Sequence, residues 1–126
     1  MEKPIKDLIS ASQKSDSIVA VILFGSHARK EAGPLSDTDV CIVAPGISQK
    51  VKLDLQSYAS AKIDILFFDD LPLNIKVRVI QEGKVLLMKD KRRVDTLSWL
   101  TLKEYFDYKI HQTRLIETYL PGVSYV

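Results

Sequence analysis

A nearly unbroken apolar run over residues 17–24 stops abruptly at Gly25-Ser26, and a second apolar run starts only at Val40, directly after Asp39. The first run is rich in β-branched residues, which is typical of a strand buried on both faces. The polar connection between the runs contains Gly33-Pro34, a pair that indicates a loop. This stretch therefore predicts a strand, a turn, a short helix beginning near Ala28, a loop, and a second strand over 39–43.

Two aspartates open the second strand. Asp37 and Asp39 are two positions apart, and residues i and i+2 of a strand point to the same face of a sheet. Their carboxylates are hard oxygen ligands that suit a divalent cation such as Mg²⁺. Asp37 could instead be an ordinary turn residue, a common role for aspartate. The pair is the first candidate for a metal site.

The turn at Gly25 and Ser26 is a candidate anion site. Gly25 permits close backbone approach, and Ser26 is placed to cap the helix that follows. The free N–H groups and the positive dipole end of such a helix attract phosphate. A helix cap without a ligand is the commoner meaning of such a turn when it stands alone. The aspartates that follow favour the binding interpretation.

The rest of the chain alternates between strand and helix patterns, which predicts an α/β (α+β) domain with a small mixed sheet and flanking helices. From about residue 92 to 119 the pattern is helical, with one or two breaks possible. The other expected elements are helices over 5–13, 48–60 and 73–81, and strands over 63–68 and 84–88.

Asp64 interrupts the otherwise apolar strand over 63–68. An unpaired carboxylate in an apolar strand is costly unless it meets a cation. A chance charge on the strand is the simpler alternative. The position of Asp64 therefore favours, without requiring, a third carboxylate at the metal site.

Length and composition indicate one domain over residues 1–126. A formal net charge of +2 is too small to indicate general nucleic-acid binding. The single cysteine, Cys41, permits no internal disulfide, which fits a reducing cytoplasm, and a buried structural thiol is expected. No segment has the apolar length of a signal peptide core or of a membrane span, so we expect a cytoplasmic protein without membrane attachment.

Three motifs occur in order: Gly25-Ser26-His27-Ala28-Arg29, then Ser36-Asp37-Thr38-Asp39, then Asp64 on a later strand. This order resembles the signature of the polymerase-beta-type nucleotidyltransferase superfamily, and within it the minimal nucleotidyltransferases (MNT proteins) of bacteria and archaea. The resemblance covers roughly the first ninety residues. It implies a nucleotidyltransferase-type fold with a catalytic core over 1–90 and a helical C-terminal segment over 91–126.

The resemblance also implies roles for the candidate residues. Asp64 would complete one metal site and help to activate the attacking hydroxyl. Arg29 matches the arginine of the family motif, although an exposed arginine on a short helix could equally be solvated. The implied set is Asp37, Asp39 and Asp64 as catalytic ligands of Mg²⁺, with Gly25, Ser26 and Arg29 binding the phosphates of ATP.

Minimal nucleotidyltransferases pair with an all-helical HEPN protein, an RNase toxin, and act as its antitoxin. The resemblance therefore implies AMPylation, the transfer of AMP from ATP to a tyrosine of the toxin. We expect the acceptor to come from outside, because the chain is too short for a second, acceptor-holding domain. Two alternatives stay open: a catalytically vestigial antitoxin that masks the HEPN RNase by binding, and a transferase that acts on a small molecule or RNA.

The C-terminal helical segment is rich in aromatic residues. Trp99, Tyr105, Phe106, Tyr108 and Tyr119 are expected to pack on the sheet, although an exposed part could dock a partner helix. The basic run ahead of them, residues 89–93, predicts a charged turn that opens a helix.

Overall fold

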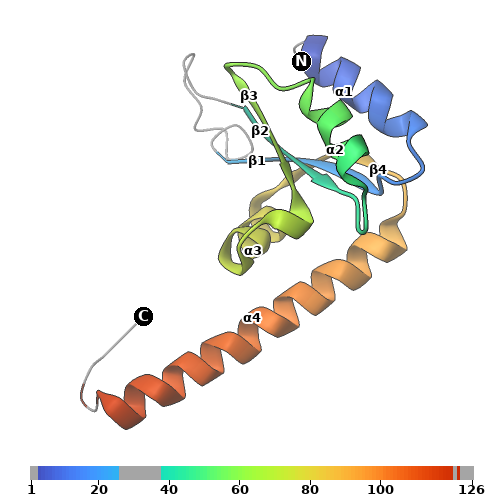
Figure 1. Ribbon diagram of the computed structural model, residues 1–126. Coiled ribbons are helices and arrows are strands. Elements are labelled where there is room, and N and C mark those ends of the chain that lie inside the picture. Colours follow the sequence, from blue (N-terminus) through green and yellow to red (C-terminus); the bar gives the residue numbers. More distant parts are fainter. Residues whose placement is uncertain (1–2, 26–37, 121, 123–126) are drawn as a thin grey trace.

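The computed structural model describes residues 3–25, 38–120 and 122. The strands form a mixed sheet with flanking helices, as predicted (Figure 1). In chain order the elements are α1 (Lys3–Lys14), β1 (Ala20–Phe24), β2 (Thr38–Val43), α2 (Gln49–Gln56), β3 (Ile63–Phe67), the 3₁₀ turn η1 (Phe68–Asp70), α3 (Leu73–Glu82), β4 (Lys84–Met88) and α4 (Lys91–Tyr119).

The sheet has the strand order β3-β2-β1-β4. β1 is antiparallel to both of its neighbours, β2 and β4, whereas β2 and β3 are parallel. The end of β1 and the starts of β2 and β3 therefore meet at one end of the sheet. Gly25, Asp39 and Asp64, the described residues of the motifs considered above for phosphate or metal, lie on or next to these three strand termini.

Both faces of the sheet are covered by helices, because its strands carry apolar residues at almost every position. α1 and α2 cover one face, and α3 with the first turns of α4 covers the other (Figure 1). The first core contains Leu8, Val21, Val40, Ile42, Leu55, Ile63 and Ile65, and the second contains Ala20, Ile22, Cys41, Val43, Phe68, Val79 and Val94.

Two elements are shorter than predicted. The first strand starts at Ala20 rather than at residue 17, because the chain still turns at Asp16 and Ser17 after α1. The predicted helix over 48–60 covers only Gln49–Gln56. Ser57 ends it, since its hydroxyl donates to the carbonyl of Asp54 at 2.6 Å. The short helix expected near Ala28 lies outside the described residues.

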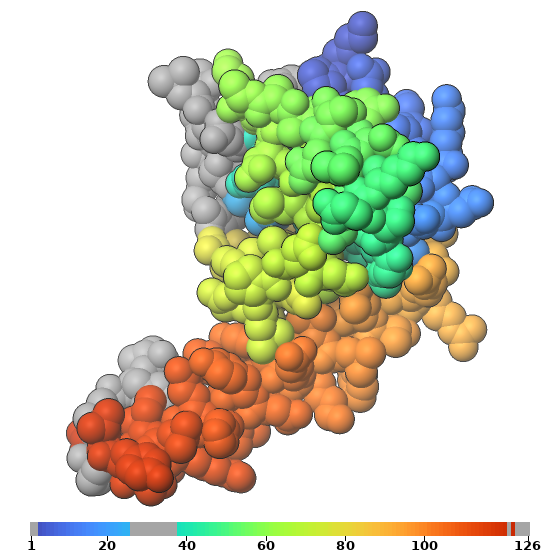
Figure 2. Space-filling model, in the orientation of Figure 1, coloured from blue at the N-terminus to red at the C-terminus, as the bar shows by residue number. Residues whose placement is uncertain are grey.

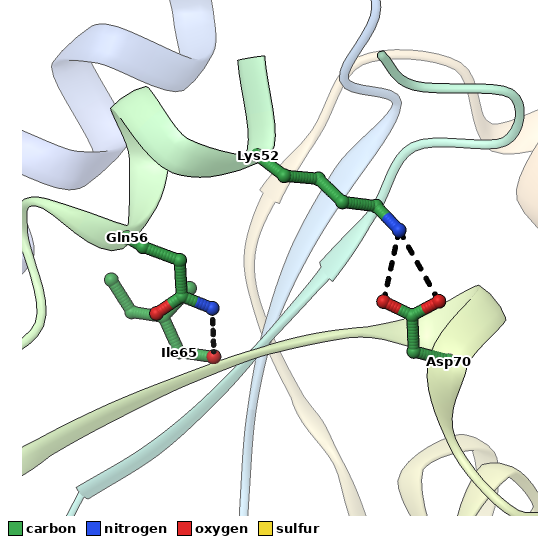
Figure 3. Close-up of polar contacts among 4 residues, drawn as sticks. All are labelled: Lys52, Gln56, Ile65 and Asp70. Carbon is green, nitrogen blue, oxygen red and sulfur yellow. Dashed lines mark hydrogen bonds and ion pairs between the residues drawn. The ribbon is translucent and has the colours of Figure 1, made fainter. Parts of the chain in front are cut away.

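α2 is joined to the edge strand β3 by two side chains (Figure 3). Gln56 Nε2 donates to the carbonyl oxygen of Ile65 at 3.0 Å. Lys52 Nζ lies 2.9 Å from Oδ2 of Asp70, which belongs to the η1 turn directly after β3. β3 is thus held on its outer side, which keeps its pairing with β2 in one alignment.

The turn before α4 is hydrogen-bonded to the end of α1. Lys89 Nζ donates to the carbonyl oxygens of Ser12 and Gln13, each at 3.2 Å, and to that of Ser15 at 2.5 Å. These carbonyls lie at or just after the end of α1. Asp90 caps α4, since its carboxylate accepts from the N–H of Arg93 at 3.1 Å. The prediction of a charged turn that opens a helix is confirmed.

α4 is continuous over 29 residues, without the breaks considered possible, and is about 43 Å long. Its first part packs on the domain through Val94 and Thr101, and the remainder projects beyond it (Figures 1 and 2). The expectation that the aromatic residues pack on the sheet was wrong for most of them. Trp99 is exposed because it lies on the side of α4 away from buried Val94 and Thr101, and Phe106, Tyr108 and Tyr119 are exposed because they lie beyond the part of the helix that packs on the domain. No helix in the described ranges is long and apolar enough to span a membrane.

Candidate active site

The parallel pairing of β2 and β3 brings two of the predicted carboxylates side by side. Asp39 on β2 is the register partner of Asp64 on β3. Directly opposed residues of neighbouring strands point to the same face, and the strands are about 4.8 Å apart. Asp39 is half-buried and Asp64 is exposed, so the pair faces solvent at the open end of the sheet.

Both carboxylates lie on the face that α3 and α4 cover further along. On β2, Asp39 and Cys41 share this face, as predicted, whereas Val40 and Ile42 point into the core under α1 and α2. Cys41 is fully buried. Burial, and secondarily the negative charge of Asp69, raise the pKa of its thiol to about 12. Cys41 is therefore a packing residue and not a nucleophile of the site.

Gly25 approaches the carboxylate of Asp39 directly. Phe24 is the register partner of Asp39, so the chain leaves β1 beside that side chain. Gly25 has φ +80°, and a Cβ built on it would lie 2.5 Å from Asp39 Oδ2. Gly25 therefore leaves room for this carboxylate, whereas its predicted close approach to phosphate stays a prediction. This contact could not be predicted from local patterns, because it depends on the register between β1 and β2.

The structure thus joins three of the six predicted site residues: Gly25, Asp39 and Asp64. The other three, Ser26, Arg29 and Asp37, lie outside the described residues. Among the residues described, no three potential metal-ligating side chains gather into one cluster.

The arrangement provides negative oxygen ligands beside Gly25. Two adjacent carboxylates form a donor set that hard divalent cations prefer. Thr38 fixes the start of β2, since its N–H donates to the Lys62 carbonyl at 2.7 Å and its side chain is buried. The pair therefore projects from a backbone fixed on both strands, a geometry suited to a metal-assisted reaction at phosphate.

Comparison with known proteins identifies the family of the chain. Residues 6–92 match the family described as polymerase beta, nucleotidyltransferase. A protein of Methanocaldococcus jannaschii, provisionally named a protein adenylyltransferase, is 35% identical over 69 residues. That match covers 55% of this chain and 55% of the relative, so the chain spans about half of its length.

Solved structures share the fold. A toxin-antitoxin structure with AMP-PNP has a TM-score of 0.70 at 17% identity, covering 91% of this chain and 94% of that chain. A complex of tri-AMPylated Shewanella oneidensis HEPN toxin with MNT antitoxin has a TM-score of 0.65 at 18% identity, covering 90% of this chain and 91% of that chain. At these identities the likeness establishes the nucleotidyltransferase-type fold.

Proposed function

Because the chain belongs to the polymerase beta nucleotidyltransferase family, we propose that it transfers AMP from ATP to a tyrosine of a helical HEPN toxin and so acts as a cytoplasmic antitoxin. The observation that carries this proposal is the register of β2 and β3, which pairs Asp39 with Asp64 at the open end of the sheet. The relative named for protein adenylylation and the solved HEPN–MNT complex support the choice of reaction and partner.

Asp39 and Asp64, together with Asp37, are the proposed ligands of Mg²⁺. The two described carboxylates fit this ion, since both are oxygen donors on one accessible face. Mg²⁺ bound there would neutralise the charge that develops on the triphosphate oxygens. Gly25, Ser26 and Arg29 are proposed to hold the β- and γ-phosphates of ATP.

The reaction balances without a further co-reactant. The tyrosine oxygen attacks the α-phosphorus, an O–P bond forms, and the bond between the α- and β-phosphates breaks. Pyrophosphate leaves toward the Gly25 turn. Asp64 is the exposed carboxylate of the pair, and it accepts the phenolic proton as a general base.

Intact-mass spectrometry tests this proposal. The chain, ATP, Mg²⁺ and a HEPN protein from the same genome should yield HEPN adducts separated by the mass of AMP, and EDTA should prevent them. Asp39→Asn and Asp64→Asn keep the shape of each side chain but remove its charge, so each should lower adduct formation at least about 100-fold. Asp70→Asn is the matched control, because Asp70 is an exposed aspartate paired with Lys52 away from the site.

The outcomes separate the proposal from its alternatives. Absence of adducts with the wild-type chain and Mg²⁺ would refute transfer to the HEPN protein. If Asp39→Asn abolished the adduct yet inhibited the HEPN RNase as well as the wild type does, masking by binding would be the correct account. Transfer to an RNA or small molecule in place of the protein would be detected as pyrophosphate release without a change in HEPN mass.

A further inference from the structure

One stripe of α4 continues beyond the domain that it packs on. Its positions alternate four and three residues apart, the spacing by which one helix packs along another. The stripe begins against the domain, where Val94 and Thr101 are buried, and ends at Tyr119, which is 75% exposed. Its members are Val94, Ser98, Thr101, Tyr105, Tyr108, Gln112, Leu115 and Tyr119.

A second apolar stripe lies on the opposite side of the same helix. Trp99, Phe106 and Ile110 are spaced seven and four residues apart and are all more than half exposed. A helix that is apolar on opposite sides is normally covered on more than one side. The start of α3 lies against the first stripe near Tyr105 and Gln112. Leu115 and Tyr119 on that stripe are exposed in the described part of the chain, as are the three residues of the second stripe. Figure 2 shows the end of α4 standing clear of the domain.

The exposed area is large enough for a specific interface. An aromatic side chain buries about 150–250 Å² when covered. At their observed exposures, Trp99, Phe106, Tyr108 and Tyr119 together offer on the order of 500 Å². A standard interface buries about 800 Å² on each partner, so these four residues supply more than half of one side.

We propose that the C-terminal half of α4, residues 105–119, together with Trp99, is the surface that docks the helical acceptor protein. This inference rests on the proposed function for the identity of the partner. The four-three spacing is the one by which helices pack along each other, so it indicates a helical partner. The two opposite stripes indicate that this partner covers α4 from two sides, as a groove between helices does. A second copy of α4 could cover one stripe but would leave the other in water.

The path of α4 leads back toward the end of the sheet that carries the site. β4 ends at the far end of the sheet from Asp39 and Asp64, and α4 starts there, passes α3 and diverges from the sheet as it leaves the domain (Figure 1). Where the stripe leaves the domain, Leu73 and Asn74 of α3 and Tyr105 and Gln112 of α4 line a cleft of about 350 Å³. The cleft gives a side chain of the partner a fixed position between the docking helix and the domain.

Calorimetry without ATP tests the docking surface separately from the reaction. The full chain is titrated with each purified HEPN protein of the same genome. Phe106→Glu and Leu115→Glu place a charge on one stripe each, and each should weaken binding at least tenfold. Leu53→Glu is the matched control, because Leu53 is 63% exposed on α2, on the other side of the sheet, and it should bind as the wild type does.

Circular dichroism and thermal unfolding must show that both α4 variants remain folded, which their exposed positions lead us to expect. Equal affinity of the variants and the wild type would refute the docking surface. So would a wild-type chain that forms a dimer broken by Phe106→Glu or Leu115→Glu while no HEPN protein binds. Failure of the proposed function is distinguishable, since it would leave tight, variant-sensitive binding with no AMP transfer.

Discussion

Replacing Gly25 by alanine would place a methyl group against the carboxylate of Asp39. The added Cβ would lie 2.5 Å from Asp39 Oδ2, which is about 1 Å too close for an ordinary van der Waals contact. Gly25 also has φ +80°, a conformation that residues with a side chain rarely adopt. The substitution therefore has two separable effects, one on the backbone and one on a proposed metal ligand.

The backbone effect should lower the free energy of unfolding by about 1–3 kcal/mol. The second effect arises because either Asp39 or the turn must move by about 1 Å. A displacement of that size at a reacting centre can cost about 100-fold in rate. We therefore expect Gly25→Ala to remain folded, to unfold at lower urea concentration, and to form HEPN adducts about 100-fold more slowly.

Gly46→Ala is the matched control. Gly46 has φ +73°, close to that of Gly25, but a Cβ there would meet nothing within 4 Å. It should lose similar stability and keep the wild-type rate of AMP transfer. Urea unfolding and intact-mass kinetics on both variants measure the two effects. Equal transfer rates for Gly25→Ala and Gly46→Ala would refute the argument that Gly25 gives Asp39 its position.

Three further predictions concern other parts of the fold. The buried Cys41 thiol should resist Ellman's reagent at pH 8 until urea unfolds the chain. Because its folded pKa of about 12 exceeds the unfolded value of about 8.5, its contribution to stability is complete below about pH 8.5 and is lost as the pH rises toward 12. Urea unfolding of the wild type and of Cys41→Ala across this pH range would check the loss. Lys89→Met should lower the free energy of unfolding by about 1–2 kcal/mol, because three carbonyls near the end of α1 lose their donor. Lys91→Met removes only an exposed ion pair with Asp95 and should lower it by less than about 1 kcal/mol. Asp90→Ala should cost about 1 kcal/mol in urea unfolding through loss of the α4 cap, and no loss would mean that the cap is dispensable.

The order of elements could be predicted because the local signals agree with the packing. Residues 63–67 are apolar except at one position, and a strand buried on one face and partly on the other forms there. The exposure of Phe106 and Tyr108 could not be predicted, because periodicity reports that a helix has apolar faces and not where the sheet beneath it ends. The length of α4 relative to the domain is a tertiary property.

The candidate site was predictable in its residue types and not in its contacts. Strand alternation and the cost of a carboxylate in an apolar strand indicate Asp39 and Asp64 as candidate ligands. Their pairing depends on the parallel alignment of β2 with β3, which no local pattern encodes. The approach of Gly25 to Asp39 likewise depends on the alignment of β1 with β2.

Asp64 also has a consequence for how reliably the sheet assembles. Asp64 is the one polar residue of β3. The other residues of the strand are apolar and could face either side of the sheet: Ile63, Ile65, Leu66 and Phe67. A shift of β3 by one position against β2 would turn Asp64 into the core beneath α1 and α2, where an unpaired carboxylate costs several kcal/mol. The same charge that is proposed to accept a proton thus penalises misaligned strands during folding, and its replacement by leucine would be expected to lower refolding yield as well as activity.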